Sequence, residues 1–222
     1  MQDISEEILC NSKWLIIKEI AQKTQSASEL ATVLKTSVSN VIQQLKLIEA
    51  YGLVRKEKST EKNIGKPKIN YALNQEFVYA LMVNQGRAEK KYFKSEGISK
   101  MMFNLLFLSS DDAYYIMKFS IKYEEILKKC KAIGFIKSTR DSIELFVITD
   151  HVDEIRAKFS NLFIEDLNGK TKKIINWSHN DFEINDGLDR GDKYFMDMLK
   201  NVQVIHDPGN VLIRYKAKRE NI

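Results

Sequence analysis

The residues from Ser37 to Lys46 combine hydrogen-bonding side chains with the spacing of a helix. Val41, Leu45 and Ile48 recur three or four positions apart, so they can hold one side of this helix against a core. The candidates for contact with DNA are then Ser37, Val38, Ser39, Asn40, Ile42, Gln43 and Lys46. Glutamine can bond adenine at two positions, serine can reach a base edge or a phosphate, and exposed valine or isoleucine can contact thymine methyl groups. The segment therefore suits the major groove of double-stranded DNA, although Ile42 could instead complete the core.

Basic residues dominate the segment from Val54 to Asn70, where only Glu57 and Glu61 oppose six lysines and arginines. A basic hairpin beside a groove-bound helix adds salt-dependent affinity for phosphate without selecting a sequence. The candidate phosphate contacts are Arg55, Lys62, Lys66 and Lys68, and Lys66 or Lys68 could enter the minor groove. The alternative is a charged hairpin that only faces solvent.

Three helices and two strands must position these residues. Trp14, Leu15, Ile17, Ile20 and Ala21 predict a first helix over about 11–23. Ser26 and Glu29 have the spacing of a capping box, which predicts a second helix with Leu30, Ala31, Val33 and Leu34 on its buried side. Ser37 is a good N-cap for the third helix. Residues 53–58 and 66–73 then predict two strands around a flexible tip.

The segment Ser37-Val-Ser-Asn-Val-Ile-Gln-Gln-Leu-Lys-Leu-Ile-Glu-Ala-Tyr-Gly-Leu-Val54 resembles the winged helix-turn-helix repressors of the ArsR and MarR type. Gly65-Lys-Pro-Lys-Ile-Asn-Tyr-Ala-Leu73 is similar to the second strand of their wing. The resemblance implies a homodimer on a pseudo-palindromic operator. The cysteine-based metal sites of the family have no counterpart here, because Cys10 and Cys130 stand far apart and His151, His179 and His206 are scattered. We therefore expect no metal and no cofactor.

The rest of the chain changes pattern. Residues 75–108 contain apolar residues at helical spacing and predict a helical linker, in which the stripe from Ile98 to Leu106 is either core or a dimer helix. Beyond it we expect helices over about 111–131, 152–163 and 189–201 and strands over 132–137, 143–149, 172–177, 182–184 and 211–215. Such alternation is typical of a mixed sheet covered by helices. The predicted domains are 1–75, the linker or dimerisation region 76–110, and 111–222.

Gly134-Phe-Ile-Lys-Ser-Thr-Arg-Asp-Ser-Ile-Glu-Leu-Phe-Val-Ile148 resembles the first motif of minimal nucleotidyltransferases, in which a Gly-Ser turn precedes a strand that bears Asp-x-Asp. Here Ser142 and Glu144 occupy the two carboxylate positions, and Phe135 replaces the serine after glycine. Glu183, on the expected strand 182–184, could supply a third-strand carboxylate. Two-metal phosphoryl transfer needs several oxygen ligands close together. The resemblance thus implies a vestigial nucleotide or metal site at Ser142, Glu144 and Glu183, with no catalytic residue.

Composition and charge indicate the number of domains, the kind of partner and the location of the chain. The chain has 222 residues, 44% of them hydrophobic and 29% charged, which suits two globular domains. Its formal charge of +5 favours a polyanionic partner. The acidic N-terminus and the short apolar runs predict a cytoplasmic chain with no signal peptide and no membrane segment.

The expected fold class is α+β: an N-terminal winged helix-turn-helix, a helical linker and a C-terminal mixed α/β domain similar to nucleotidyltransferases. The expected function is a dimeric, sequence-specific transcriptional regulator whose C-terminal domain serves assembly or senses a small-molecule or nucleotide effector. Two alternatives stay open. One is an active nucleotidyltransferase that uses the winged helix to bind its substrate, and the other is a structural adaptor in a transcription or replication complex.

Overall fold

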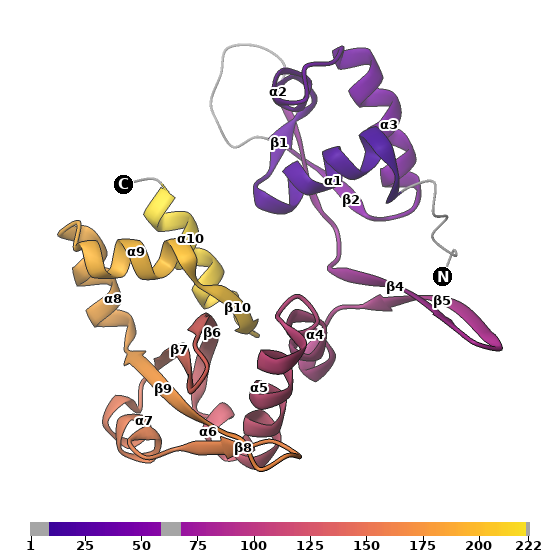
Figure 1. Cartoon of the computed structure of the whole chain (residues 1–222). Helices are drawn as coiled ribbons and strands as arrows, with labels where there is room; N and C mark the ends of the chain where they lie inside the picture. The colour runs from indigo at the N-terminus through magenta and orange to yellow at the C-terminus, as the bar shows by residue number, and fades with distance from the viewer. Residues whose placement is uncertain (1–8, 59–67, 221–222) are drawn as a thin grey trace. The chain divides into compact units, whose positions relative to one another are not determined.

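The computed structural model describes residues 9–58 and 68–220, and the chain divides into two compact units, Met1–Ser95 and Glu96–Ile222 (Figure 1). Both units combine helices with sheets, so the α+β class expected from the sequence is confirmed. None of the helices within these described ranges has the length and the apolar character needed to cross a membrane.

Up to residue 73, the described part of the N-terminal unit forms three helices and a small antiparallel sheet. The helices are α1 (Asn11–Gln22), α2 (Ala27–Val33) and α3 (Val38–Ala50), and the strands are β1 (Gln25–Ser26), β2 (Val54–Lys58) and β3 (Ile69–Leu73) in the order β1-β3-β2. Apolar side chains from all three helices and from β2 and β3 form one core. α1 contributes Ile16, Ile17 and Ile20 to this core. Trp14 and Leu15, which were expected on the apolar side of this helix, are exposed. Val33 of α2 is exposed as well.

The helical linker expected from Gln75 is wrong for residues 77–94. They form two antiparallel strands, β4 (Phe77–Asn84) and β5 (Arg87–Lys94), which we call the β4–β5 ribbon. Their turn needs Gly86, whose φ of +80° is a backbone conformation that other residues rarely adopt. At the base of the ribbon Phe77 stacks on Tyr92, with ring centroids 5.5 Å apart, and both rings pack on the core of the N-terminal unit. This packing decides between helix and strand, because the apolar spacing of the segment fits either.

The C-terminal unit begins with α4 (Gly97–Leu105), α5 (Ser110–Lys122) and α6 (Glu124–Leu127). A five-stranded mixed sheet follows, in the order β10-β6-β7-β9-β8. Its strands are β6 (Cys130–Ser138), β7 (Ser142–Thr149), β8 (Phe163–Glu165), β9 (Thr171–His179) and β10 (Gln203–His206). The remaining helices are α7 (Val152–Phe159), α8 (Asp181–Asp189), α9 (Lys193–Asn201) and α10 (Val211–Glu220). Only β7 and β9 pair in parallel within the described sheet, so the mixed sheet expected from the alternating pattern is present.

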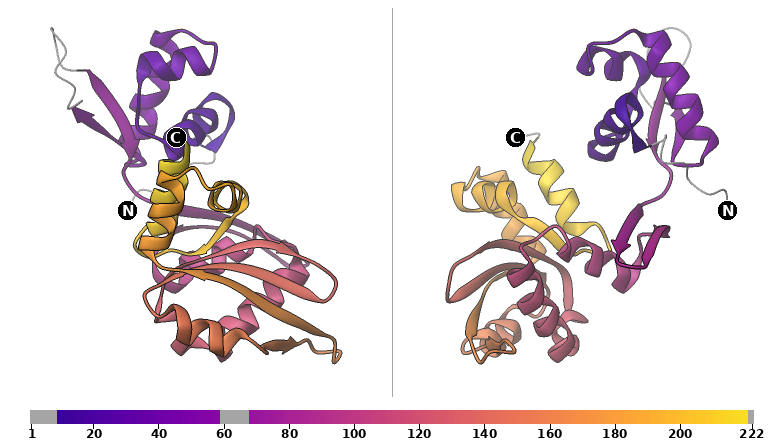
Figure 2. Two further views of the ribbon diagram at one scale, coloured as in Figure 1. Left: turned by 90° about the vertical axis from the view of Figure 1, so that its left-hand side faces the viewer. Right: turned by 45° about the vertical axis from the view of Figure 1, so that its right-hand side comes forward.

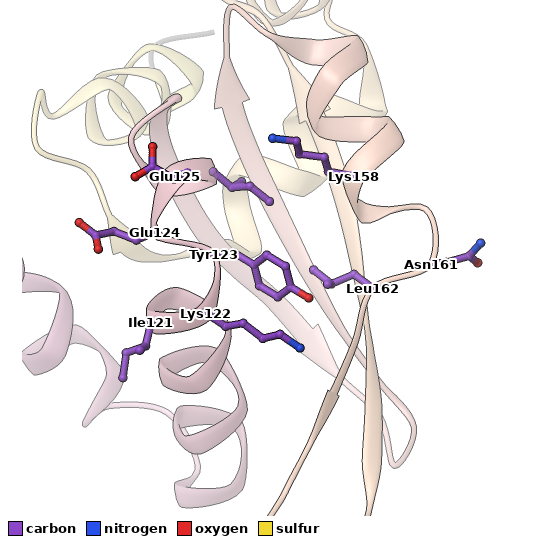
Figure 3. A pocket seen from close by; sticks show the side chains of 9 residues that line it. Ile121, Lys122, Tyr123, Glu124, Glu125, Lys158, Asn161 and Leu162 are labelled. Atoms are coloured by element: carbon purple, nitrogen blue, oxygen red, sulfur yellow. The ribbon is translucent and has the colours of Figure 1, made fainter.

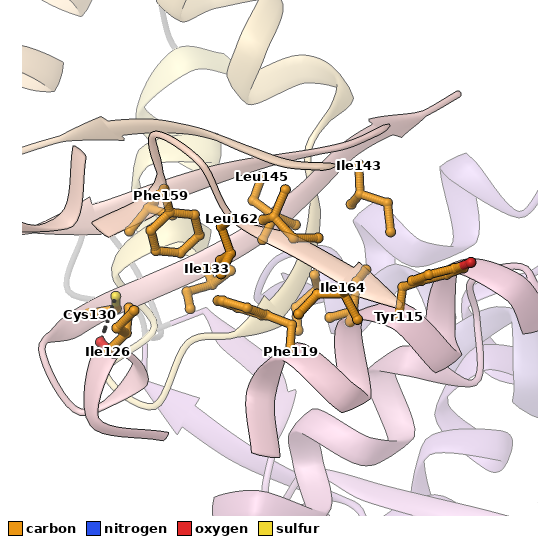
Figure 4. Packing of buried hydrophobic residues seen from close by; sticks show 14 of the residues in the cluster. Tyr115, Phe119, Ile126, Cys130, Ile133, Ile143, Leu145, Phe159, Leu162 and Ile164 are labelled. Carbon is orange, nitrogen blue, oxygen red and sulfur yellow. Dashed lines mark hydrogen bonds between the residues drawn. The ribbon is translucent and has the colours of Figure 1, made fainter. Parts of the chain in front are cut away.

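Helices cover both faces of this sheet (Figure 2). On one face Ile133, Leu145 and Ile164 pack with Tyr115 and Phe119 of α5 and with residues of α4, α6 and α7 (Figure 4). On the other face Phe146 and Ile148 pack against α8, α9 and α10. In the stripe noted from Ile98 to Leu106, Met101 and Leu105 belong to the first core, whereas Met102 and Leu106 are exposed.

Two expected strands are helices instead. Residues 182–184 lie in α8, because Asn180 and Glu183 form a capping box at its start. Residues 211–215 lie in α10, because the buried Asp207 carboxylate accepts the backbone N–H groups of Val211 at 2.7 Å and Ile213 at 3.1 Å. The strand β10 lies just before this turn and was not expected.

Candidate nucleic-acid interface

The start of α2 is fixed by reciprocal capping, as the sequence predicts. The Glu29 backbone N–H donates to Ser26 Oγ at 3.4 Å, and the Ser26 backbone N–H donates to Glu29 Oε2 at 2.8 Å. A turn follows in which Lys35 has a φ of +52° and the Thr36 N–H donates to the Ala31 carbonyl at 3.0 Å. Ser37 then caps α3 by accepting the Asn40 N–H at 3.2 Å. These short-range bonds determine how α3 is oriented against α2.

The two sides of α3 differ in burial. Val41, Leu45 and Ile48 are fully buried, as expected. The opposite side is exposed and carries five of the candidate DNA contacts: Val38, Ser39, Ile42, Gln43 and Lys46. Ile42 is 36% exposed and Val38 is 43% exposed, so Ile42 does not complete the core in this structure. The result is a mixed apolar and polar surface, one helix wide.

Asn40 and Ser37 take part in the structure of the turn. Asn40 Nδ2 donates to Thr36 Oγ1 at 3.0 Å, and its Oδ1 accepts from Gln44 Nε2 at 3.4 Å. The Asn40 amide is half-buried, whereas Ser37 stays exposed with its hydroxyl at the helix start. Asn40 thus supports the exposed surface of α3 from one side, and Ser37 remains at its edge.

Arg55 of β2 and Lys68, which immediately precedes β3, are held in ion pairs. Arg55 lies 2.6 Å from Glu57 and also donates to the Leu73 carbonyl, and Lys68 lies 2.9 Å from Glu29. Hydrogen bonds from Lys68 and then Ser26 lower the pKa of Glu29 to about 2, so its carboxylate is charged at neutral pH. Lys62 and Lys66, the other two expected phosphate contacts, lie outside the described residues. Lys46 of α3 has no ion pair with any residue in the described ranges.

The carboxylates expected to mark a vestigial nucleotide site do not converge. Glu144 accepts from Trp177 Nε1 at 2.9 Å and pairs with Lys137 at 3.2 Å. Ser142 bonds Thr139, with the two hydroxyl oxygens 2.9 Å apart. Glu183 lies on α8 rather than on a strand, and its side chain contacts His179. His179 is level with Ile148, four positions beyond Glu144 along β7, which is about 13 Å.

Gly134, the glycine of the same motif, is in the middle of β6 and not in a turn. A Cβ at this position would lie 2.2 Å from Val202 Cγ2, so the glycine is needed for close packing against the segment that leads into β10. A packing role therefore accounts for this glycine. Among the described residues, no three His, Cys, Asp or Glu side chains come together in an arrangement that could hold a metal ion.

Sequence reasoning missed a row of polar and aromatic side chains on the C-terminal unit. The His179 ring contacts Glu183 Oε2 through Nδ1 at 3.1 Å and the Tyr194 hydroxyl through Nε2 at 2.9 Å. Burial lowers the pKa of His179 and outweighs the opposite effect of Glu183. The ring is therefore neutral at pH 7, and donation from Nδ1 to the carboxylate leaves Nε2 to accept the Tyr194 proton. The capping pattern Asn180-x-x-Glu183 was the available signal, since it places Glu183 one turn after His179.

A surface pocket of the C-terminal unit lies where α5 and α6 meet α7 and the following loop, and Tyr123, Lys158 and Asn161 are among its lining residues (Figure 3). Its charged groups have nearby partners: Lys128 pairs with both Glu124 and Glu125, and Lys158 pairs with Glu154. None of the sequence-predicted site residues lines this pocket. The exposed side of α3 therefore remains the principal candidate site.

Comparison with curated proteins gave no match to the chain. A scan against family models gave a match over residues 8–72, which span α1 to β3, and the matching family carries the description HVO_A0114.

Proposed function

We propose that the chain is a cytoplasmic, sequence-specific DNA-binding transcriptional regulator whose N-terminal unit is a winged helix-turn-helix. The observation that carries the proposal is the exposed side of α3, where Val38, Ser39, Ile42, Gln43 and Lys46 face away from a fully buried apolar side. A helix presented in this way fits the major groove with its N-terminal turns nearest the bases. The strands β2 and β3 are the base of the proposed wing.

The exposed side chains of α3 make different kinds of contact with DNA. Gln43 can make two hydrogen bonds with adenine, and Ser39 can reach a base edge or phosphate from the preceding turn. Val38 and Ile42 supply apolar surface for thymine methyl groups. Lys46, one turn beyond Ile42, supplies charge for the backbone. Direct reading of bases by Gln43 therefore sets specificity, and Lys46 adds affinity for any sequence.

The ion pairs of Arg55 and Lys68 are compatible with phosphate binding. Both pairs are at the surface, and such pairs stabilise proteins by only about 0 to 1 kcal/mol. A phosphate can replace the carboxylate partner at little cost, with release of counterions from the DNA. In free protein these pairs hold the two basic side chains close to β3, where the proposed wing starts.

We extend the proposal to a homodimer in which two copies read the half-sites of a pseudo-palindrome, with the C-terminal unit serving assembly or the sensing of a small-molecule or nucleotide effector. Half-sites separated by one turn of DNA have centres about 34 Å apart. The two copies of α3 must therefore be held at a fixed distance and orientation. Exposed apolar surface supports assembly, since Met102 of α4 is 53% exposed and Leu106, the residue just after α4, is 73% exposed.

Selection of bound fragments from random duplexes tests the proposal. We expect enrichment of one motif by the wild-type protein, and a weaker or altered preference for Gln43→Ala, with a loss of about 1 to 3 kcal/mol at the base pair that Gln43 contacts. Gln22→Ala is the matched control, because it makes the same change on the exposed side of α1. Equal affinity for selected and random duplexes, or equal effects of both variants, would rule out sequence-specific reading by α3.

The dependence of affinity on salt separates the two kinds of contact. Lys46→Ala should lower the slope of log affinity against log salt by about 0.9 and weaken all duplexes alike, because one phosphate contact is lost. Gln43→Ala should leave that slope unchanged. Identical slopes for the wild-type protein and Lys46→Ala would remove Lys46 from the interface.

A further inference from the structure

The two strands of the β4–β5 ribbon differ sharply in charge. β5 carries Arg87, Glu89, Lys90, Lys91 and Lys94, whereas β4, Phe77-Val-Tyr-Ala-Leu-Met-Val-Asn84, has no charged residue. Within the described chain the two strands pair only with each other, so each also presents an edge. One edge of the ribbon is therefore basic and the other is apolar and neutral.

Exposed strand edges are templates for pairing with another strand, and natural proteins protect them with lysine, proline or a bulge. The lysines of β5 can protect its edge in this way. β4 has none of these devices, and its eight residues pair with β5 in an unbroken register. Its outer half is also apolar and open to solvent, with Leu81 at 68% and Val83 at 70% exposure. A two-stranded ribbon of this kind is marginally stable in water by itself.

The backbone hydrogen bonds show which groups of β4 face its open edge. The Ser95 N–H donates to the Glu76 carbonyl at 3.0 Å, which makes Glu76 and Ser95 a hydrogen-bonded pair one step before the ribbon. Because such pairs alternate in antiparallel sheets, Met82 is hydrogen-bonded to Glu89. The N–H and C=O groups of Leu81 and Val83 then point away from β5.

We propose that β4 pairs with β4 of a second copy of this chain, antiparallel and around a two-fold axis at Met82, to form a continuous sheet β5-β4-β4-β5. The inference rests on the dimer of the proposed function and assigns the surface that forms it. In this register Leu81 is opposite the partner's Val83, and Met82 is opposite the partner's Met82. The four side chains at positions 81 and 83 lie on one face of the new sheet and cover one another.

The charge distribution selects a second copy over DNA as the occupant of this edge. β4 has no cationic side chain to neutralise phosphate, whereas two neutral strands meet without repulsion. Pairing through β4 also leaves the two basic β5 strands outermost, about 14 Å apart across three strand spacings, which exceeds the Debye length of about 8 Å at physiological salt. The two-fold arrangement uses the same surface on both copies, so it closes and does not propagate.

Cysteine cross-linking of the full chain tests the contact directly. We place Met82→Cys in a Cys10→Ser background, because Cys10 is exposed and Cys130 is buried. Directly opposite residues that do not share hydrogen bonds have Cα atoms about 4.5 Å apart, within the range of a disulfide. Mild oxidation should therefore give a disulfide-linked dimer. Glu89→Cys in the same background is the matched control, since it lies beside Met82 on the same ribbon but about 14 Å from its copy, and it should stay monomeric on denaturing gels.

A pair of lysine substitutions tests the edge by its effect on assembly. Val83→Lys places a charge on the proposed pairing strand, and Ala88→Lys places the same charge on its cross-strand partner in β5. Light scattering over a concentration series should show a dimer dissociation constant raised at least tenfold for Val83→Lys and unchanged for Ala88→Lys. Circular dichroism checks that both variants are folded.

Three results would each overturn this assignment. They are equal cross-linking of the two cysteine variants, equal effects of the two lysine variants, and a wild-type protein that is monomeric at all concentrations. Failure here is separable from failure of the proposed function. A monomer that selects a DNA motif removes the β4 contact and keeps the DNA-binding proposal. A dimer that cross-links through Met82→Cys but selects no DNA motif supports the β4 contact and contradicts the proposal of a sequence-specific regulator.

Discussion

Lys68, the residue just before β3, has its Nζ 2.9 Å from Oε1 of Glu29 in the first turn of α2. The other oxygen of the same carboxylate accepts the backbone N–H of Ser26 at 2.8 Å and its hydroxyl at 2.7 Å. One glutamate therefore both completes the cap of α2 and connects that helix to Lys68, 39 positions further along the chain and next to β3. The pair links α2, the helix that precedes α3, to the start of the second strand of the proposed wing.

Removal of the Lys68 ammonium should raise the pKa of Glu29. We expect Lys68→Met to move it from about 2 toward its usual value of 4.5, because the largest stabilising hydrogen bond of the carboxylate is lost. NMR titration of the glutamate side chain measures the shift, with Lys46→Met as the control. A depressed carboxylate pKa adds stability above pH 4.5 that is lost as the pH falls toward 2, and this acid-labile part should shrink in Lys68→Met. A Glu29 pKa unchanged by the substitution would contradict the pairing.

Lys172 is the most deeply buried described cation, and its neutralisation should destabilise the C-terminal unit. Its ammonium lies 2.6 Å from Asp111 and 3.1 Å from Asp112, and its side chain is 3% exposed. Burial raises the pKa of Asp112, but hydrogen bonds from Ser109, Ser138 and Lys172 outweigh that effect and leave the pKa below its usual value. Lys172→Met should therefore lower the free energy of unfolding by about 3 to 5 kcal/mol, because it leaves a buried carboxylate without its cation.

Urea denaturation measures this loss, and Lys170→Met, two positions earlier at an exposed site, is the matched control. A loss below about 1 kcal/mol for Lys172→Met would show that Ser109 and Ser138 alone suffice to hold the Asp112 carboxylate.

The stability of the C-terminal unit should fall in mild acid. Burial lowers the pKa of His179 and of His206, so both rings are held neutral in the folded protein. The unfolded chain then binds more protons than the folded one, and the free energy of unfolding drops as the pH falls below about 6.5. Chemical denaturation at pH 7.5 and 5.5 measures the drop, which should be smaller in His179→Gln. An equal drop in that variant would assign the whole effect to other groups.

Gly134 should not tolerate even one added carbon. The Cβ of Gly134→Ala would meet Val202 Cγ2 at 2.2 Å and the Gln203 carbonyl oxygen at 3.2 Å, and overpacking of this kind costs about 1 to 3 kcal/mol. Val202→Ala removes the closest atom, so the double variant should lose less stability than the sum of the two single variants. Additive losses in thermal unfolding would show that the strand backbone, not Val202, makes the conflict.

The sequence alone was sufficient for α1, α2 and α3 and for the pairing of β2 with β3, because their determinants are short-range. The Ser26 and Glu29 capping box, the Ser37 cap and the spacing of Val41, Leu45 and Ile48 all act within one or two helical turns. The exposed side of α3 follows from the same spacing. That Arg55 and Lys68 are engaged by Glu57 and Glu29 could not be foreseen, because side chains choose among several partners only once the strands and helices are assembled.

Tertiary structure decided the segments whose apolar runs fit helix and strand equally well. Phe77 and Tyr92 anchor the β4–β5 ribbon on the core of the N-terminal unit, although the spacing of Phe77, Val78 and Leu81 also suits a helix. The run Val211-Leu-Ile213 suits a strand in isolation, yet the buried Asp207 carboxylate draws its backbone N–H groups into the first turn of α10. In both places the local free energies of helix and strand are similar, so a single long-range packing contact or a single buried cap determines which one forms.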